Sequence, residues 1–225
     1  MLNESKGNMY KFVTHTWNPI KGECSHDCVY CYMKSHGKQK QIRLVEKELK
    51  DDLRDANFIF VGSSTDMFAS DIPEMWIKRV LRVCNKYNNR YLFQSKNTKR
   101  FNNYDIIHSF PSNTVLGTTI ETNNNDLLKT ISNAPHPWDR ANMLSLFKDH
   151  DKMVTIEPIL DFDLFELVHL VANTSPSWVN IGADSKGHNL PEPTWKQVQE
   201  LINELSKFTD VHLKDNLKRL RSNND

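Results

Sequence analysis

The feature that most restricts the fold of this chain is the alternation of short strand-like runs with longer amphipathic stretches. Six short runs rich in β-branched and aromatic residues have the length of buried strands: 12–17, 58–61, 91–94, 115–119, 153–156 and 178–181. Stretches with helical periodicity lie between or after them: 44–54, 74–87, 139–150, 164–171 and 195–208. Strands that alternate with helices form βαβ units, so the pattern predicts a parallel sheet whose helices cover one face.

The number of units predicts a barrel that does not close. A complete eight-fold barrel takes about 250 residues, whereas this chain has 225 residues and six clear strand-like runs. A further strand near residues 210–213 would follow the last helix. No linker, repeat or low-complexity segment divides the sequence. We therefore expect one α/β domain over residues 1–225, built as an open, partial (βα)6 TIM-like barrel.

Polar residues follow the strand-like runs at the points where the strands should end. The carboxyl ends of parallel strands meet at one edge of a sheet, and the chemistry of α/β folds collects there. These residues are Asn18, 62–66, Gln94, Ser95, Lys96, Thr118, Thr119, Glu121, Glu157, Asn180 and 182–184. The sequence therefore predicts a polar funnel that is lined from six directions.

Three of the four cysteines form a tight group in the string GECSHDCVYCY, where Cys24, Cys28 and Cys31 are spaced Cys-x3-Cys-x2-Cys. Four-iron clusters are normally held by four cysteine thiolates. Three thiolates would leave one iron open to a small molecule. A zinc site with His26 as a fourth ligand is the alternative. The distant Cys84 is interpreted as a small buried core residue.

Composition excludes several classes of protein. The N-terminal string MLNESKGNMYKF has no apolar signal-peptide core, so we expect a cytoplasmic protein with reduced cysteines. No apolar run reaches membrane-spanning length, and no membrane partner is expected. The 29 basic and 28 acidic residues give a net charge of +1, which provides no electrostatic reason to expect a nucleic-acid backbone as partner.

The cysteine motif, together with the aromatic Tyr30, resembles that of the radical S-adenosylmethionine (SAM) enzymes. In that superfamily the open iron of a 4Fe-4S cluster chelates SAM, and reductive cleavage yields a 5′-deoxyadenosyl radical. Further strings resemble a phage-associated radical SAM family related to spore photoproduct lyase: THTWNPIKGEC, FVGSSTDMF, LGTTIETN, VTIEPIL, NIGADSKG and HLKDNL. The resemblance spans residues 14–217 and implies a partial barrel of the radical SAM type.

The resemblance also implies roles for individual residues. The cluster ligands would be Cys24, Cys28 and Cys31, and Tyr30 would pack beside the cluster and the adenine. In place of the usual Gly-Gly-Glu turn that receives the SAM amino group stand Ser63, Ser64 and Thr65.

Five further cofactor contacts are expected. Asp66 is the carboxylate available to the SAM ammonium, and Thr118 and Thr119 are placed to contact the ribose or the carboxylate. Glu121 is also expected to contact the cofactor. Arg140 is the best cation for the SAM carboxylate, because a guanidinium can bind it through two hydrogen bonds. A surface ion pair is the alternative role for Arg140.

The remaining polar residues predict the class of substrate. We expect catalytic roles for Glu157, Asp184 and Lys214, and substrate contacts from Trp17, Asn18, Gln94, Lys96 and Asn180. Carboxylates pair well with N–H donors, such as a guanine-like base edge or a protonated amine. The 7-deazaguanine base queuine has both features, and a family of radical SAM queuine lyases exists with which this chain is compatible. The alternatives are a buried structural role for Glu157 and the capping of a turn by Asp184.

Two other functions remain open. One is a radical SAM enzyme that repairs or modifies a base in DNA or RNA, as spore photoproduct lyase does. It would need a basic rim and base flipping, and the near-neutral charge disfavours it. The other is a non-enzymatic iron–sulfur or zinc module. For the enzyme, the expected partners are a small nucleobase substrate and an electron donor, either a reductase or a flavodoxin or ferredoxin.

Overall fold

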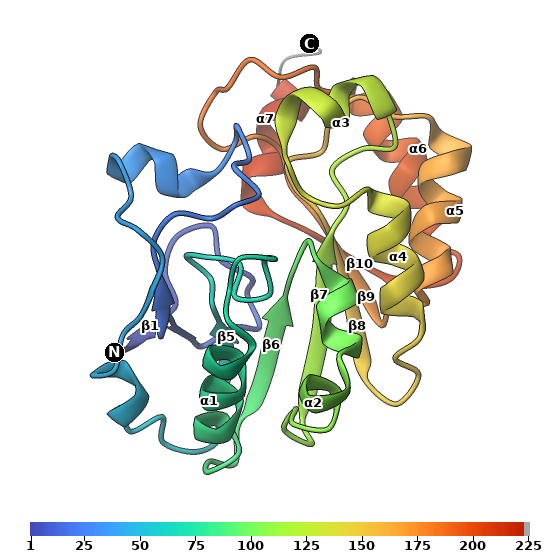
Figure 1. Cartoon of the computed structure of the whole chain (residues 1–225). Helices are drawn as coiled ribbons and strands as arrows, with labels where there is room; N and C mark the ends of the chain where they lie inside the picture. Colours follow the sequence, from blue (N-terminus) through green and yellow to red (C-terminus); the bar gives the residue numbers. More distant parts are fainter. Residues whose placement is uncertain (223–225) are drawn as a thin grey trace.

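The computed structural model describes residues 1–222, and its main element is an eight-stranded sheet (Figure 1). The strand order is β1-β2-β5-β6-β7-β8-β9-β10. The bounds are Leu2–Glu4, His15–Trp17, Phe58–Val61, Arg90–Gln94, Thr114–Thr119, Asp151–Ile156, Trp178–Ile181 and Asp210–Leu213. All neighbouring pairs are parallel except β1 with β2. The expected α/β class with a mostly parallel sheet is confirmed.

The α-helices α1 to α6 connect successive strands, and α7 follows the last strand. They are α1 Glu74–Cys84, α2 Tyr104–Ile107, α3 Asn125–Ile131, α4 Pro137–Ser145, α5 Leu164–Thr174, α6 Trp195–Leu205 and α7 Lys218–Ser222. Short 3-10 helices are η1 Tyr32–His36, η2 Glu48–Lys50, η3 Thr98–Asn102 and η4 Asp215–Leu217, and a small second sheet pairs β3 Ile20–Lys21 with β4 Arg43–Leu44. Figure 1 shows α4, α5 and α6 together along the outer side of β7 to β10. No helix among residues 1–222 is long and apolar enough to cross a membrane.

The helices form where apolar residues recur at helical spacing. In α1, Ile77, Val80, Leu81 and Cys84 share one face and are fully buried in the core. The buried Cys84 confirms its interpretation as a core residue. In α6, Thr194 and Gln197 form a capping box that fixes the start of the helix.

The inside of the open barrel is apolar at the amino ends of the strands. Tyr10, Phe12 and Val13 pack there against Leu92 and Met153. Side chains alternate along each strand, so residues two positions further on along β6 and β8 face the same interior. The N-terminal segment thus fills the interior of the barrel at the amino ends of the strands, and the polar side chains gather at the carboxyl ends.

Two expectations about local structure were wrong. Residues 44–54 do not form a helix: Leu44 pairs with Ile20 in the small sheet, and Glu48 in η2 forms an ion pair with Lys21. The first strand spans only His15–Trp17, because the chain turns at Tyr10, whose carbonyl accepts from Val13 N at 3.0 Å. The sequence analysis also missed β1 and α3. The expected strand at 210–213 is present as β10.

Candidate active site

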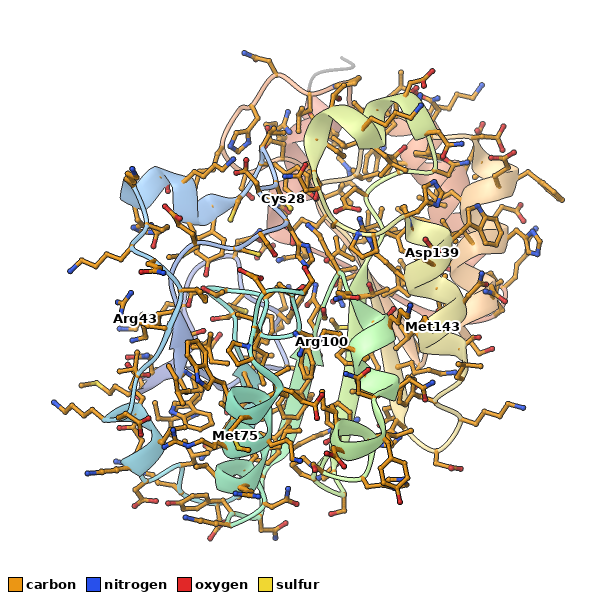
Figure 2. The ribbon with its side chains drawn as sticks, in the orientation of Figure 1. Cys28, Arg43, Met75, Arg100, Asp139 and Met143 are labelled. Carbon is orange, nitrogen blue, oxygen red and sulfur yellow. The ribbon has the colours of Figure 1, made fainter. Side chains whose placement is uncertain are left out.

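The cysteine loop, residues 22–31, connects the small sheet to η1. Figure 2 shows Cys28 beyond the carboxyl end of β6. Gly22 opens the loop with φ +129°, and a Cβ there would lie 2.7 Å from the carbonyl oxygens of Lys40 and Gln41. Only glycine fits such a position without displacing backbone. The loop is therefore fixed at its start by a close backbone contact.

All three thiols of the loop are free, with Cys28 buried and Cys24 and Cys31 partly exposed. The Cys28 Sγ lies 3.2 Å from Lys96 Nζ and 3.2 Å from Ser132 Oγ. Burial, with a smaller effect of the Asp66 carboxylate, raises the pKa of the Cys24 thiol to about 12. That thiol therefore holds its proton in the metal-free protein, and metal binding would release it.

The loop offers three thiols as ligands for an iron–sulfur cluster, whereas His26, the fourth ligand that a zinc ion would use, already has a partner. Within residues 1–222, no three His, Cys, Asp or Glu side chains converge as ligands of one metal ion. The Nε2 atom of His26 lies 2.9 Å from Asp66 Oδ2 and is occupied by that contact. Three free thiols on one loop, one beside an ammonium group, are the ligand chemistry of an iron–sulfur cluster.

A buried ionic cluster lies directly beside Cys28, and its members are Tyr30, Lys96, Glu121 and Arg140. Glu121 is fully buried, and its carboxylate accepts from Arg140 Nη1 at 2.8 Å and lies 3.0 Å from Lys96 Nζ. The Tyr30 hydroxyl also donates to Glu121. Burial alone would raise the pKa of Glu121, but the two cations prevail and lower it to about 2. Glu121 is therefore ionised throughout the neutral range.

Arg140 contacts other groups of the protein in this arrangement, and its expected contact with the SAM carboxylate stays a prediction. Its side chain is 1% exposed and donates to the Pro135 and Thr119 carbonyls at 2.6 and 2.8 Å, besides Glu121. The Nε and Nη1 donors of the guanidinium are thus bound within the protein. Nor is its pair with Glu121 the surface ion pair that the alternative had expected.

Replacement of Arg140 by methionine is expected to destabilise the fold by roughly 3–5 kcal/mol, because it leaves the buried Glu121 charge uncompensated on that side. Urea denaturation at pH 7 measures the loss. The Arg79→Met variant is the control and should change stability little, because its pair with Glu46 lies in solvent. An unchanged midpoint in Arg140→Met would contradict the structural role.

The same charge cluster makes the stability of the fold depend on pH in the acid range. A depressed carboxyl pKa contributes stability that is fully present above the unfolded pKa, here 4.5, and is lost as pH falls through the folded value of about 2. Stability should therefore fall between these pH values in the wild type, and by less in Glu121→Gln.

Asp66 organises the cysteine loop and the β6 loop. Its Oδ2 accepts from His26 Nε2, Ser95 Oγ and Lys96 N at 2.9, 2.9 and 2.8 Å, and its Oδ1 accepts from Phe68 N at 2.9 Å. These four bonds tie Asp66 to both loops, and its expected contact with the SAM ammonium stays a prediction.

The turn after β5 docks on the cysteine loop. Asn18 Oδ1 accepts from Ser64 N at 2.9 Å and from Ser63 Oγ at 3.2 Å. The Thr65 hydroxyl donates to the Gly22 carbonyl at 3.1 Å, and the Tyr32 hydroxyl donates to the Ser63 carbonyl at 3.0 Å. Residues 63–65 thus lie against the start of the loop, and Asn18 supports this turn instead of facing an open funnel.

A second polar cluster surrounds Glu157. Its Oε2 accepts from Lys214 Nζ at 2.6 Å, and its Oε1 accepts from Asn216 Nδ2 at 2.8 Å and from Asn8 Nδ2 at 2.9 Å. Gly182 makes this approach possible, because a Cβ there would lie 2.7 Å from Glu157 Oε1. The structure therefore joins Glu157 and Lys214, which lie 57 residues apart in the chain.

A row of contacts leads from Lys214 through Tyr10 and Gln94 to Thr119. Lys214 Nζ lies 4.7 Å above the Tyr10 ring, and the Tyr10 hydroxyl donates to Gln94 Oε1 at 2.8 Å. Gln94 Nε2 in turn donates to Thr119 Oγ1 at 2.9 Å. The neighbouring Thr118 hydroxyl donates instead to the Ser95 carbonyl and is fully buried, so it does not reach a ribose.

Three expected substrate or catalytic residues lie elsewhere or make other contacts. Trp17 is fully buried and its indole donates to Asp51, so it does not line the site. Asp184 accepts from the backbone of Lys186 and His188 and from the His188 ring, which is the capping role given as its alternative. Asn180 is buried with its amide nitrogen unpartnered, on the same sheet face as Thr155, its register partner.

Sequence reasoning missed three residues of the Glu157 cluster: Asn8, Tyr10 and Asn216. Asn8 and Tyr10 lie between β1 and β2, before the first strand that the sequence predicted, where no rule based on the predicted strand ends would find them. Asn216 lies in the string HLKDNL and follows β10. It could have been found by including the residues after the last predicted strand, at 210–213, among the candidates.

Comparisons with known proteins agree with this architecture. A family profile described as "Protein of unknown function (DUF5131)" matches residues 8–204. No curated protein matches the chain significantly by sequence. Among solved structures, spore photoproduct lyase complexed with dinucleoside spore photoproduct has a TM-score of 0.57 at 11% identity, covering 90% of this chain and 64% of that one.

Two further solved structures are similar. Methylornithine synthase (PylB) has a TM-score of 0.57 at 11% identity, covering 87% of this chain and 63% of that one. Streptococcus suis SuiB bound to S-adenosylmethionine has a TM-score of 0.58 at 10% identity, covering 88% and 49%. All three are radical SAM enzymes, and the chain spans between about half and two thirds of their lengths. The fold is therefore the partial TIM-like barrel of the radical SAM type.

Proposed function

The chain belongs to the DUF5131 family, and we propose that it is a radical SAM enzyme that acts on a small modified nucleobase. The observation that carries the proposal is the position of the three free thiols. They lie on one loop at the carboxyl edge of a barrel of the radical SAM type, beside buried polar clusters. That edge is where α/β barrels carry their chemistry.

Cys24, Cys28 and Cys31 would hold a 4Fe-4S cluster. When bound, the cluster supplies one electron for the reductive cleavage of SAM. The chain's own residues would bind SAM and orient it. Ser63, Ser64 and Thr65 border the loop, where a SAM amino group would need acceptors, and Tyr30 is held by Lys96 and Glu121. Tyr30 therefore presents a fixed ring beside Cys28.

The pairing of Glu157 with Lys214 supports the proposed substrate class. The two side chains are 18% and 11% exposed and place a carboxylate and an ammonium side by side. A base edge that offers both an N–H donor and a carbonyl acceptor, as a 7-deazaguanine does, matches such a pair. We propose a lyase reaction on queuine or a related base, with Glu157 and Lys214 as the polar contacts and Gln94 as a further one.

A second candidate, a base-modifying enzyme of DNA or RNA, is supported by the likeness to spore photoproduct lyase, whose structure holds a dinucleoside. The net charge of +1 disfavours it.

The electron donor would dock near the cysteine loop. Residues 28–45 contain no Asp or Glu, while Lys34, Lys38, Lys40 and Arg43 are all exposed. Figure 2 shows Arg43 at the outer edge of the molecule. An acidic one-electron carrier of the flavodoxin or ferredoxin type is complementary to this segment.

The test is anaerobic reconstitution followed by incubation with SAM and a reductant. We expect about four irons per chain and the release of 5′-deoxyadenosine. Product formation is then measured with free bases, nucleosides and oligonucleotides. A protein that binds about one zinc, or that leaves SAM intact, would overturn the proposal.

A further inference from the structure

The ammonium group of Lys96 contacts a thiol of the cysteine loop. Lys96 Nζ lies 3.2 Å from Cys28 Sγ, within hydrogen-bond distance for sulfur. Lys96 follows β6, whereas Cys28 lies on the loop after β3. The contact is therefore made only by the tertiary fold, and no resemblance in the sequence assigns it.

The position of this ammonium is fixed from several sides. Nζ donates to the Tyr30 hydroxyl at 2.6 Å and to Glu121 Oε1 at 3.0 Å, and it lies 4.5 Å from the centre of the Tyr30 ring. The backbone nitrogen of Lys96 donates to Asp66 at 2.8 Å. With 14% of its side chain exposed, the group is shielded from solvent that would screen its charge.

The ammonium is shared between the Glu121 carboxylate and the Cys28 sulfur. Glu121 is itself paired with Arg140 at 2.8 Å, so charges alternate from Arg140 through Glu121 to Lys96, whose ammonium lies beside Cys28 Sγ. A stronger hold by Glu121 would weaken the hydrogen bond to the sulfur, and a weaker hold would strengthen it.

We propose that Lys96 is a positioning residue that raises the reduction potential of the cluster, and that Glu121 opposes it. The inference rests on the proposed function. One-electron reduction adds negative charge to the cluster. A nearby cation and a hydrogen bond to a ligand sulfur stabilise the reduced form relative to the oxidised form. The electron comes from the external one-electron donor, and no bond in Lys96 changes.

The inference predicts shifts of opposite sign from two neighbouring residues. Lys96→Met removes the cation and should lower the midpoint potential. Glu121→Gln removes the competing anion and should raise it. Each change should alter the reduction equilibrium by about tenfold or more, which is about 59 mV for one electron.

The experiment is a redox titration of the reconstituted holoprotein, followed by the electron paramagnetic resonance signal of the reduced cluster. Lys78→Met, which breaks a lysine–carboxylate pair with Asp105 on the outer helices, is the matched control and should leave the potential unchanged. Iron content and the midpoint of thermal unfolding are measured for every variant.

The outcomes separate the two proposals. A wild type that assembles no four-iron cluster overturns the proposed function. A wild-type cluster whose potential is unchanged in Lys96→Met, or shifts in the same direction in both variants, overturns the role of Lys96 alone. If Lys96→Met cannot hold a cluster, the Glu121→Gln variant decides: a rise supports the inference, and no change or a fall refutes it.

Discussion

Replacement of Cys24, Cys28 or Cys31 by alanine is expected to abolish cluster assembly and SAM cleavage completely. Each variant leaves two thiols on the loop, and no other cysteine in the chain is near enough in the sequence to replace the third. Four-iron clusters depend on such thiolate ligands. Iron and sulfide analysis, the visible absorption of the reconstituted protein and 5′-deoxyadenosine release measure the loss.

The Cys84→Ala variant is the matched control for this prediction. Cys84 is fully buried in the core on α1, and burial raises the pKa of its thiol far above the ordinary value. A protonated core thiol is a poor metal ligand. The variant should keep its iron and its SAM cleavage and lose only some stability. Loss of iron in Cys84→Ala alone would refute the assignment of the cluster to the loop.

Glu157→Gln is expected to reduce kcat/KM for the substrate by roughly 10- to 100-fold, which corresponds to about 1.5–3 kcal/mol for a charge-assisted hydrogen bond. The glutamine keeps the size of the side chain but loses the charge that holds Lys214, and its NH2 group would face other donors. SAM cleavage without substrate should persist, because Glu157 contacts no member of the cysteine loop among its hydrogen-bond partners. Separate assays of the two reactions test this difference.

Gly182→Ala tests the same cluster without changing a charge. The added Cβ would lie 2.7 Å from Glu157 Oε1 and 2.9 Å from Asn216 Oδ1, so the carboxylate must move. We expect a similar loss of turnover. The control is Glu204→Gln. Glu204 lies on α6 and forms an exposed ion pair with Lys207, so this variant should behave as wild type. Normal turnover in both Glu157→Gln and Gly182→Ala would refute the substrate site.

Salt dependence separates the two substrate classes. A free base neutralises no phosphates, so its turnover should change little between low and moderate salt. An oligonucleotide bound through 6–10 phosphate contacts would lose roughly three to five decades of affinity between 50 and 200 mM salt. Reaction on an oligonucleotide alone, with that steep dependence, would favour the repair-type enzyme.

The sequence by itself determined the class of fold and the cysteine loop. Strand-like runs such as 58–61 and 178–181 became β5 and β9 with those bounds, because runs rich in β-branched and aromatic residues favour buried strands. The helix predicted at residues 44–54 is absent. Their apolar and charged side chains instead take part in the pairing of β3 with β4 and in the ion pair of Glu48 with Lys21. The spacing of Cys24, Cys28 and Cys31 is local, so the sequence alone is enough to find it.

Only the tertiary structure decided which polar residues meet. Arg140 and Asp66 carry the charges that a cofactor site would need, yet each is occupied inside the protein, by Glu121 and by His26. Lys96 was expected to contact substrate and instead reaches Cys28, 68 residues away. A buried charge must find a partner to offset its desolvation. Which partner it finds depends on how the strands are ordered in the sheet, and periodicity along the chain does not carry that information.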